Sequence, residues 1–258
     1  MTDQNPLPPV PLSYLDPGDG RRIAIRHRAA TQAMPTVVFL PGYASDMEGE
    51  KASAIDAYCA ARGAGCLRLD YSGTGSSAGN FADGTMGRWL DEVLAAIDMA
   101  VPTGDLIVAG SSMGGWLAVH AALRRKDRVK GLLGIAAAPD FTDWGYSDEE
   151  RAAIVRDGRI DLRDPNSQDV QTTHEGFWRS GEAFRLLWNP IDLPIPVRFV
   201  HGLADHTVPI GVPLKLIDQL HSSDVQIRFI KGGGHRLSEP HEIHAILVEL
   251  YNLVELIR

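Results

Sequence analysis

The sequence predicts an α/β protein in which a mostly parallel sheet is flanked by helices, and two observations support this. Short apolar runs alternate with longer helical patterns, which is typical of strand–helix–strand units. Several of these runs are apolar throughout, as expected for parallel strands that are buried on both faces. About fifty residues, 138–192, interrupt the alternation. We expect them to form a small helical cap inserted into a single domain that spans residues 1–258.

The elements are expected in a regular order. A β-ribbon opens the chain at residues 12–16 and 22–28. Strands are then predicted at 36–40, 65–69, 106–109, 129–136, 197–200 and 225–230. Helices are predicted at 51–62, 85–100, 113–125, 210–221 and 240–257. The last helix places Ile243, Ile246 and Leu250 on one face, so it should dock on the sheet.

The cap segment is rich in aromatic residues and shows no convincing strand. Its aromatic residues are Phe141, Trp144, Tyr146, Phe177, Trp178, Phe184 and Trp188. Two interpretations stay open: these side chains line a pocket for an apolar group, or they form the core of the cap itself. Under the first interpretation Trp144, Phe177 and Trp178 are candidates for substrate binding. The arginines of the segment either meet a carboxylated leaving group or form a solvated helix face.

Composition narrows the classes of function. Lys and Arg number 25 against 33 Asp and Glu, a net charge of −8, which argues against nucleic acid or an anionic membrane as a partner. No apolar run approaches the ~18 residues of a membrane span, and residues 1–15 lack the layout of a signal peptide. Cys59 and Cys66 suggest neither a disulfide framework nor a metal site. A cytoplasmic protein is therefore expected; its oligomeric state is left open.

The pattern Gly-x-Ser-x-Gly occurs twice, at residues 110–114 and 75–79. A nucleophilic serine needs a sharp turn between a strand and a helix, with small neighbours, so that its hydroxyl stands above the sheet. Ser112 has this context, because the buried run 106–109 leads into it and a helical pattern follows directly. Ser77 lies several residues beyond its strand, so a flexible loop near the mouth of the site is its expected role. Context therefore selects Ser112.

A serine hydroxyl is a weak nucleophile at neutral pH, so it needs a base with a pKa near 7. Of nine histidines, His235 is the best candidate, because it follows the strand 225–230 through a glycine loop at the sheet edge where catalytic residues of such folds collect. Three histidines of neighbouring loops are interpreted as surface or hydrogen-bonded residues: His201, His206 and His241.

An acid must orient this base. Asp205 follows the strand 197–200, and the order Ser112, Asp205, His235 is the one expected when a serine on such a turn leads the triad. Asp140, just beyond the preceding strand, is the main alternative; otherwise it is a turn residue that begins the cap.

An oxyanion forms when the serine attacks a carbonyl, and preorganised donors must meet it. Two backbone N–H groups are expected to do so. One belongs to Met113, the residue after the nucleophile, and the other to Tyr43 in the loop after the strand 36–40. The side chain of Tyr43 either walls an acyl pocket, which makes it a further candidate for substrate binding, or simply packs.

By these residues the chain resembles the α/β-hydrolase superfamily along nearly its whole length. Five motifs fall in order: Pro41-Gly-Tyr43, Asp70-Tyr-Ser-Gly-Thr-Gly-Ser76, Gly110 to Gly115, Gly202 to Pro209, and Gly234-His235. More narrowly, the segments 39–43, 68–77 and 110–117 look like the mitochondrial depalmitoylase and acyl-glucuronide esterase group of abhydrolase-domain proteins. The resemblance implies ester or thioester cleavage on acyl substrates, with Ser112, Asp205 and His235 as the triad.

The sequence therefore predicts a serine hydrolase that cleaves esters or thioesters of apolar acyl groups through an acyl-enzyme, on a small-molecule or acylated substrate. This chemistry needs no metal and no organic cofactor. Two alternatives stay open, because a fold does not fix a function. One is a carbon–carbon bond hydrolase of the meta-cleavage-product type, and the other is a ligand-binding protein without useful catalysis.

Overall fold

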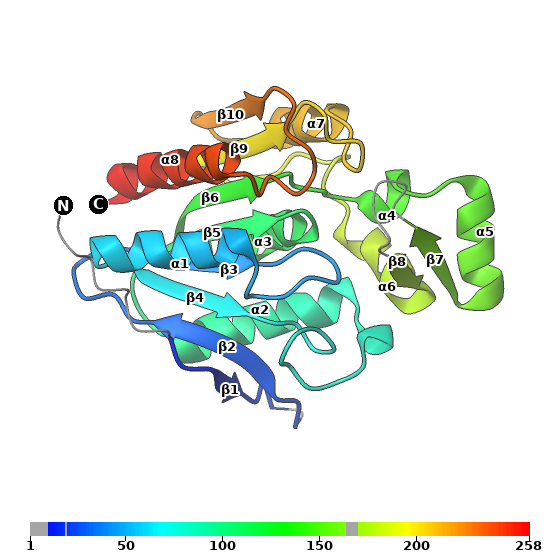
Figure 1. Ribbon diagram of the computed structural model, residues 1–258, viewed down its shortest axis with the longest axis horizontal. Helices are drawn as coiled ribbons and strands as arrows, with labels where there is room; N and C mark the ends of the chain where they lie inside the picture. Colours follow the sequence, from blue (N-terminus) through cyan, green and yellow to red (C-terminus); the bar gives the residue numbers. More distant parts are fainter. Residues whose placement is uncertain (1–9, 19, 164–169) are drawn as a thin grey trace.

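An eight-stranded sheet forms the centre of the molecule in a computed structural model that describes residues 10–18, 20–163 and 170–258 (Figure 1). The strand order is β1-β2-β4-β3-β5-β6-β9-β10, and all neighbours from β4 to β10 run parallel. At one edge of this sheet β1 and β2 pair antiparallel, and β2 is also antiparallel to β4. Of the N-terminal segment 1–15, residues 1–9 lie outside the described residues.

The elements of the sheet and its helices lie within two residues of the expected bounds. The strands are β1 (Ser13–Leu15), β2 (Ile23–Arg28), β3 (Thr36–Leu40), β4 (Gly65–Leu69), β5 (Leu106–Ser111), β6 (Val129–Ile135), β9 (Val197–Gly202) and β10 (Val225–Ile230). The helices are α1 (Glu50–Arg62), α2 (Met86–Ala100), α3 (Met113–Arg124), α7 (Gly211–Gln219) and α8 (Pro240–Ile257). A 3₁₀ turn, η1 (Phe81–Asp83), precedes α2.

Local signals fix where these helices begin and end. Helix α8 starts with Pro240, and the carboxylates of Glu239 and Glu242 exchange hydrogen bonds with each other's backbone in a capping box. Helix α1 ends at Gly63, whose φ of 71° is left-handed. Both signals can be read from the sequence. This is why the predicted bounds of these helices differ little from the observed ones.

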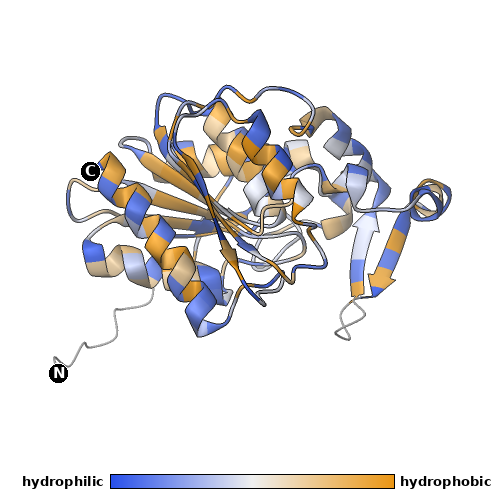
Figure 2. Ribbon diagram, turned by 90° about the horizontal axis from the view of Figure 1, so that it is seen from above, coloured by the Kyte–Doolittle hydropathy of each residue, from blue (hydrophilic) through white to orange (hydrophobic). Residues whose placement is uncertain are grey.

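The helices cover the sheet on two faces, each with its own buried core. Apolar side chains of α2, α3 and α7 pack on one face, where Trp89 and Trp116 are fully buried. Those of α1 and α8 pack on the other, together with the buried thiols of Cys59 and Cys66, which form no disulfide. Figure 2 shows the hydrophobic strands in the centre, between helices whose hydrophilic residues lie on their outer sides.

The segment between β6 and β9 extends to one side of the sheet (Figure 1) and contains both helices and strands. Its elements are α4 (Phe141–Trp144), α5 (Asp148–Asp157), β7 (Arg159–Arg163), β8 (Val170–His174), α6 (Glu175–Ser180) and the 3₁₀ turn η2 (Gly181–Phe184). Strands β7 and β8 pair antiparallel, from Arg159 with His174 to Arg163 with Val170. The expectation of a segment without strands is therefore wrong.

The physical reason for this error is that β7 is a short strand outside the main sheet. Its sequence Arg-Ile-Asp-Leu-Arg alternates polar and apolar residues, and only Ile160 and Leu162 are partly buried. A search for buried parallel strands looks for continuous apolar runs, which such a half-exposed hairpin does not contain.

Candidate active site

Ser112 stands in the sharp turn between β5 and α3. Its backbone has φ 54° and ψ −119°, a conformation that costs a non-glycine residue on the order of 1–3 kcal/mol and persists only where the surroundings enforce it. The surroundings are crowded: a Cβ on Gly110 would lie 2.1 Å from the Gly114 carbonyl oxygen. A Cβ on Gly114 would lie 2.1 Å from the Leu40 oxygen. The two glycines of the motif are thus required by close backbone contacts around Ser112.

The structure brings Ser112, His235 and Asp205 together from three separate loops. His235 Nε2 lies 3.0 Å from Ser112 Oγ, and His235 Nδ1 lies 2.9 Å from Asp205 Oδ2. With its proton on Nδ1, the imidazole donates to the carboxylate and accepts the serine proton at Nε2. All three residues follow the carboxyl ends of parallel strands, β5, β9 and β10, which meet at one edge of the sheet.

Asp205 is held by its own loop as well as by the imidazole. The side chain is fully buried, and Oδ1 accepts hydrogen bonds from the backbone N–H groups of Thr207 at 2.9 Å and Val208 at 2.8 Å. Burial raises the pKa of Asp205, but the hydrogen bond and charge of His235 and the Val208 amide outweigh it, so the pKa lies below its ordinary value. The carboxylate is therefore ionised at neutral pH, as an acid that orients a histidine must be.

The three other histidines considered in the sequence do not take part in the hydrogen bonds that join Ser112, His235 and Asp205. His206 and His241 are exposed. His201 is buried on β9, and its Nε2 lies 3.1 Å from the Val208 oxygen and 3.9 Å from Asp205 Oδ2. Burial lowers the pKa of His201 despite the nearby carboxylate. A neutral His201 that donates to Val208 supports the loop that carries Asp205.

Asp140, the alternative acid, has other partners. It is fully buried, adopts a left-handed φ of 57°, and begins α4. Its carboxylate accepts hydrogen bonds from the backbone N–H groups of Leu186 and Leu187, at 2.8 and 2.9 Å respectively. Asp140 thereby ties the start of the inserted segment to its return to the sheet.

Two backbone N–H groups near Ser112 are available as oxyanion donors. No hydrogen bond within the described part of the chain uses the N–H groups of Tyr43 or Met113. Met113 is the first residue of α3, where helix N–H groups have no partner within the helix and the dipole is positive. Gly42, next to Tyr43, lies against Ser112: a Cβ on Gly42 would be 3.4 Å from Ser112 Cβ.

The ring of Tyr43 joins the body of the protein to the inserted segment. It contacts Phe81, Phe141 and Phe177 with ring centroids 5.1, 5.8 and 4.6 Å away. Its hydroxyl donates to the Thr172 carbonyl of β8 at 3.0 Å. Phe177 is buried, whereas Tyr43, Phe81 and Phe141 are partly exposed. The cluster is thus a packed core with an apolar edge at the surface.

The two tryptophans singled out in the sequence are anchored within the inserted segment. The indole N–H of Trp144 donates to the Pro139 carbonyl at 2.7 Å, and that of Trp178 to the Thr142 carbonyl at 2.9 Å. Both are partly exposed. Of the six arginines in the segment, several pair with local carboxylates, for example Arg185 with Asp143 at 2.9 Å.

Ser77 is not part of a flexible loop, contrary to expectation. Its hydroxyl donates to the Asp70 carbonyl at 2.7 Å and accepts from the Ala24 N–H at 2.7 Å. It therefore fixes the loop after β4 to strand β2. No pattern in the sequence shows this role, because both partners are backbone groups.

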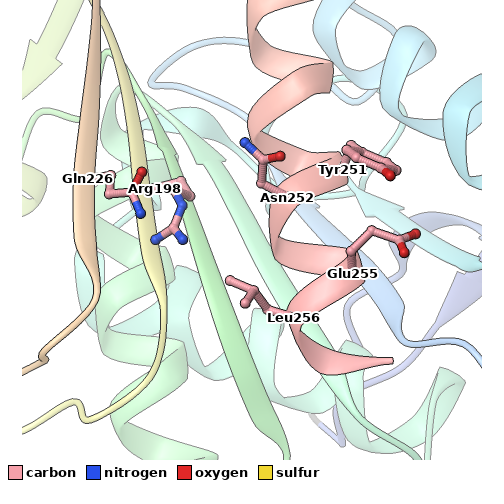
Figure 3. Close-up of a pocket in the computed structure, with 6 residues that line it drawn as sticks. All are labelled: Arg198, Gln226, Tyr251, Asn252, Glu255 and Leu256. Atoms are coloured by element: carbon pink, nitrogen blue, oxygen red, sulfur yellow. The ribbon is translucent and has the colours of Figure 1, made fainter.

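An open pocket of about 340 Å³ lies away from this site (Figure 3). It is formed by the starts of β9 and β10 and by the last turns of α8, with Arg198 and Gln226 opposite Tyr251, Asn252, Glu255 and Leu256. Arg198 is ion-paired with Asp224 at 2.8 Å. Among the described residues, no group of three or more His, Cys, Asp or Glu side chains is placed to hold a metal ion. Nor does the described part of the chain contain a helix long and apolar enough to cross a membrane.

The sheet topology and the strained turn at Ser112 together define a serine hydrolase with the α/β-hydrolase fold. Residues 31–153 match the family described as serine aminopeptidase, S33. The mitochondrial palmitoyl-protein thioesterase ABHD10 of Mus musculus is 37% identical over 251 residues, which cover 95% of this chain and 82% of the relative. The Homo sapiens protein of the same name is 34% identical, over 95% of this chain and 80% of the relative.

A solved structure agrees with these relatives. The α/β-hydrolase domain-containing protein 10 from mouse superposes with a TM-score of 0.89 at 34% identity, over 96% of this chain and 100% of that one. The chain therefore belongs to the ABHD10 family of α/β hydrolases. The predictions of the fold, of the family resemblance and of a hydrolase enzyme are confirmed.

Proposed function

We propose that this chain cleaves esters or thioesters of apolar acyl groups through an acyl-enzyme on Ser112. The observation that carries the proposal is the continuous pair of hydrogen bonds from Ser112 Oγ through His235 to the buried Asp205. The relatives are named palmitoyl-protein thioesterases, which supports a long-chain acyl thioester as the first substrate to test.

The geometry supports a two-step acyl transfer. His235 Nε2 takes the hydroxyl proton of Ser112 while Oγ attacks the acyl carbon, and the N–H groups of Tyr43 and Met113 hold the oxyanion. Asp205 stabilises the imidazolium that forms. The tetrahedral intermediate expels the alcohol or thiol, which receives the proton from His235. Water, activated by the now neutral His235, then attacks the acyl-enzyme and releases the acid.

The surroundings of Tyr43 support a preference for apolar acyl groups. Tyr43, Phe81 and Phe141 present partly exposed apolar edges beside the loop that touches Ser112. Trp144 packs against the same core, and the buried ring of Phe177 contacts the rings of Tyr43 and Phe141. A buried methylene contributes about 0.8 kcal/mol, which corresponds to roughly fourfold in kcat/KM. An acyl chain on this surface should therefore be favoured in proportion to its length until the surface is covered.

The test is a chain-length series of acyl thioesters and oxygen esters, from acetyl to palmitoyl, measured with the wild type and with Ser112→Ala. We expect kcat/KM to rise with chain length and activity to be lost in the variant. Preference for acetyl over all longer chains would remove the apolar-surface argument. Full activity in Ser112→Ala would overturn the proposal itself.

Two further measurements separate the alternative functions. Turnover of a vinylogous diketone with poor turnover of thioesters would indicate carbon–carbon bond hydrolysis. Absence of labelling by a fluorophosphonate probe, together with absent turnover, would indicate a ligand-binding protein. The predicted cytoplasmic location is likewise a proposal, since the relatives are named mitochondrial. Fractionation of cells that express the protein would decide it.

A further inference from the structure

Two consecutive buried residues, Asp70 and Tyr71, follow β4 in the motif Asp-Tyr-Ser-Gly-Thr-Gly-Ser, and the proposed function uses neither of them. Their exposed fractions are 1% and 0%. Strand β4 lies beside β3 in the sheet, so the loop after β4 adjoins the loop after β3, which carries Tyr43. Both side chains form hydrogen bonds with the backbone of that second loop.

Tyr71 contacts the loop at its start. Its hydroxyl donates to the Pro41 carbonyl at 2.9 Å and thereby fixes the peptide plane between Pro41 and Gly42. The next peptide plane carries the N–H of Tyr43, and its carbonyl, that of Gly42, accepts from the Ser45 N–H at 3.2 Å. The orientation of the proposed oxyanion donor thus depends on two successive peptide planes, and Tyr71 holds the first.

Asp70 contacts the loop at its far end. Its Oδ1 accepts from the Met47 N–H at 2.7 Å, and its Oδ2 accepts from the Ser76 N–H at 2.8 Å. Arg68 donates to the Met47 carbonyl at 2.9 Å. The loop from Pro41 to Met47 is therefore held at both ends by side chains from one neighbouring segment.

The phenol of Tyr71 is itself immobilised. Its ring stacks on Trp89 with centroids 5.3 Å apart. The backbone carbonyl of Tyr71 accepts a hydrogen bond from Thr74 Oγ1 at 2.9 Å. Burial, reinforced by the charges of Glu92 and Asp70, keeps the pKa of Tyr71 well above its ordinary value, so the hydroxyl stays a donor at any working pH.

We propose that Tyr71 is a positioning residue of the oxyanion hole, which holds the Pro41 carbonyl so that the Tyr43 N–H points at the reacting carbonyl oxygen. Asp70 assists by fixing the same loop at Met47. The inference rests on the proposed function, because it takes Ser112 as the nucleophile and Tyr43 as an oxyanion donor.

The experiment compares Tyr71→Phe with the wild type, and with Tyr58→Phe as a matched control. Tyr58 lies in α1 on the opposite face of the sheet, and its buried hydroxyl has no hydrogen-bond partner among the described residues. We expect Tyr71→Phe to lower kcat for an acyl ester about tenfold with little change in KM. This is less than the 10² to 10³ lost when a donor is removed outright, because the N–H remains but is less well aligned. Tyr58→Phe should leave kcat unchanged.

A second measurement separates positioning from general damage: inhibition by a trifluoromethyl ketone with an acyl chain. Ser112 Oγ bonds to the ketone carbon, its proton passes to His235, and the carbonyl electron pair becomes an oxyanion, so no group leaves. The inhibition constant should rise by the same factor as kcat falls. The shape of the pH profile of kcat should stay that of the wild type.

Unchanged kcat and unchanged ketone affinity in folded Tyr71→Phe, with an active wild type, would overturn the inference and leave the proposed function intact. Undiminished turnover in Ser112→Ala would instead remove the proposed function. If Tyr71→Phe does not fold, Asp70→Asn takes its place. It is expected to show the same parallel loss of kcat and ketone affinity, and constant values for both would count against the inference.

Discussion

A methyl group added at Gly114 should disable the enzyme by displacing the loop that carries Tyr43. In Gly114→Ala the new Cβ would lie 2.1 Å from the Leu40 oxygen and 2.5 Å from the Pro41 oxygen. Non-bonded carbon atoms keep about 3.5–4.0 Å apart, and a carbon–oxygen contact needs only slightly less, so the loop must retreat by roughly 1 Å. A misplacement of about 1 Å can cost 10² in rate. We therefore expect kcat to fall about 100-fold.

Gly87→Ala is the matched control, because Gly87 is also a helical glycine. Its added Cβ would meet Phe184 at 3.5 Å, an ordinary contact. We expect wild-type kcat and a gain in stability of about 0.5–1 kcal/mol. Gly114→Ala should lose about 1–3 kcal/mol through overpacking, measured by urea unfolding. The measurement is the steady-state kcat for hydrolysis of an acyl ester by the two folded variants and the wild type. A wild-type kcat in Gly114→Ala would refute the reasoning.

Two further predictions concern the charged and titratable groups. Burial lowers the pKa of His120 to about 4 from 6.5, so the unfolded chain binds the proton first as the pH falls, and stability is lost between these values. From pH 7 to pH 5 the wild type should lose about 2 kcal/mol more stability than His120→Gln, which still donates to the Phe184 carbonyl; equal losses in urea unfolding would contradict this. Asp205→Asn should lower kcat about 10⁴-fold with little change in Tm. The amide oxygen must face the Thr207 and Val208 N–H groups, so the NH₂ group meets His235 Nδ1 and drives its proton to Nε2; a kcat within tenfold of wild type would rule this out.

The strands and helices of the main sheet were predictable because each carries a strong local signal. β5 and β3 are fully buried and read as continuous apolar runs, while α8 shows a one-sided apolar pattern. The parallel order of these elements then brings the loops after β5, β9 and β10 to one edge. That is why the sequence alone could place Ser112, Asp205 and His235 at one edge of the sheet.

Other features leave no such signal in the sequence. The β7–β8 hairpin is too exposed to resemble a core strand. Ser77, Asp70 and Tyr71 act on backbone groups of distant segments, and a backbone partner adds no recognisable residue type to the pattern. A buried carboxylate followed by a buried tyrosine and a Gly/Ser-rich turn was visible as a motif, but its partners emerge only from the fold.

The claim that Ser112 is the nucleophile is tested most directly by trapping the acyl-enzyme. The wild type is mixed with a long-chain acyl thioester, quenched in acid, digested and examined by mass spectrometry. We expect one acyl group on the peptide that contains Ser112, released by hydroxylamine and missing in Ser112→Ala. An acyl group on the peptide that contains Ser77, or continued turnover in Ser112→Ala, would contradict it.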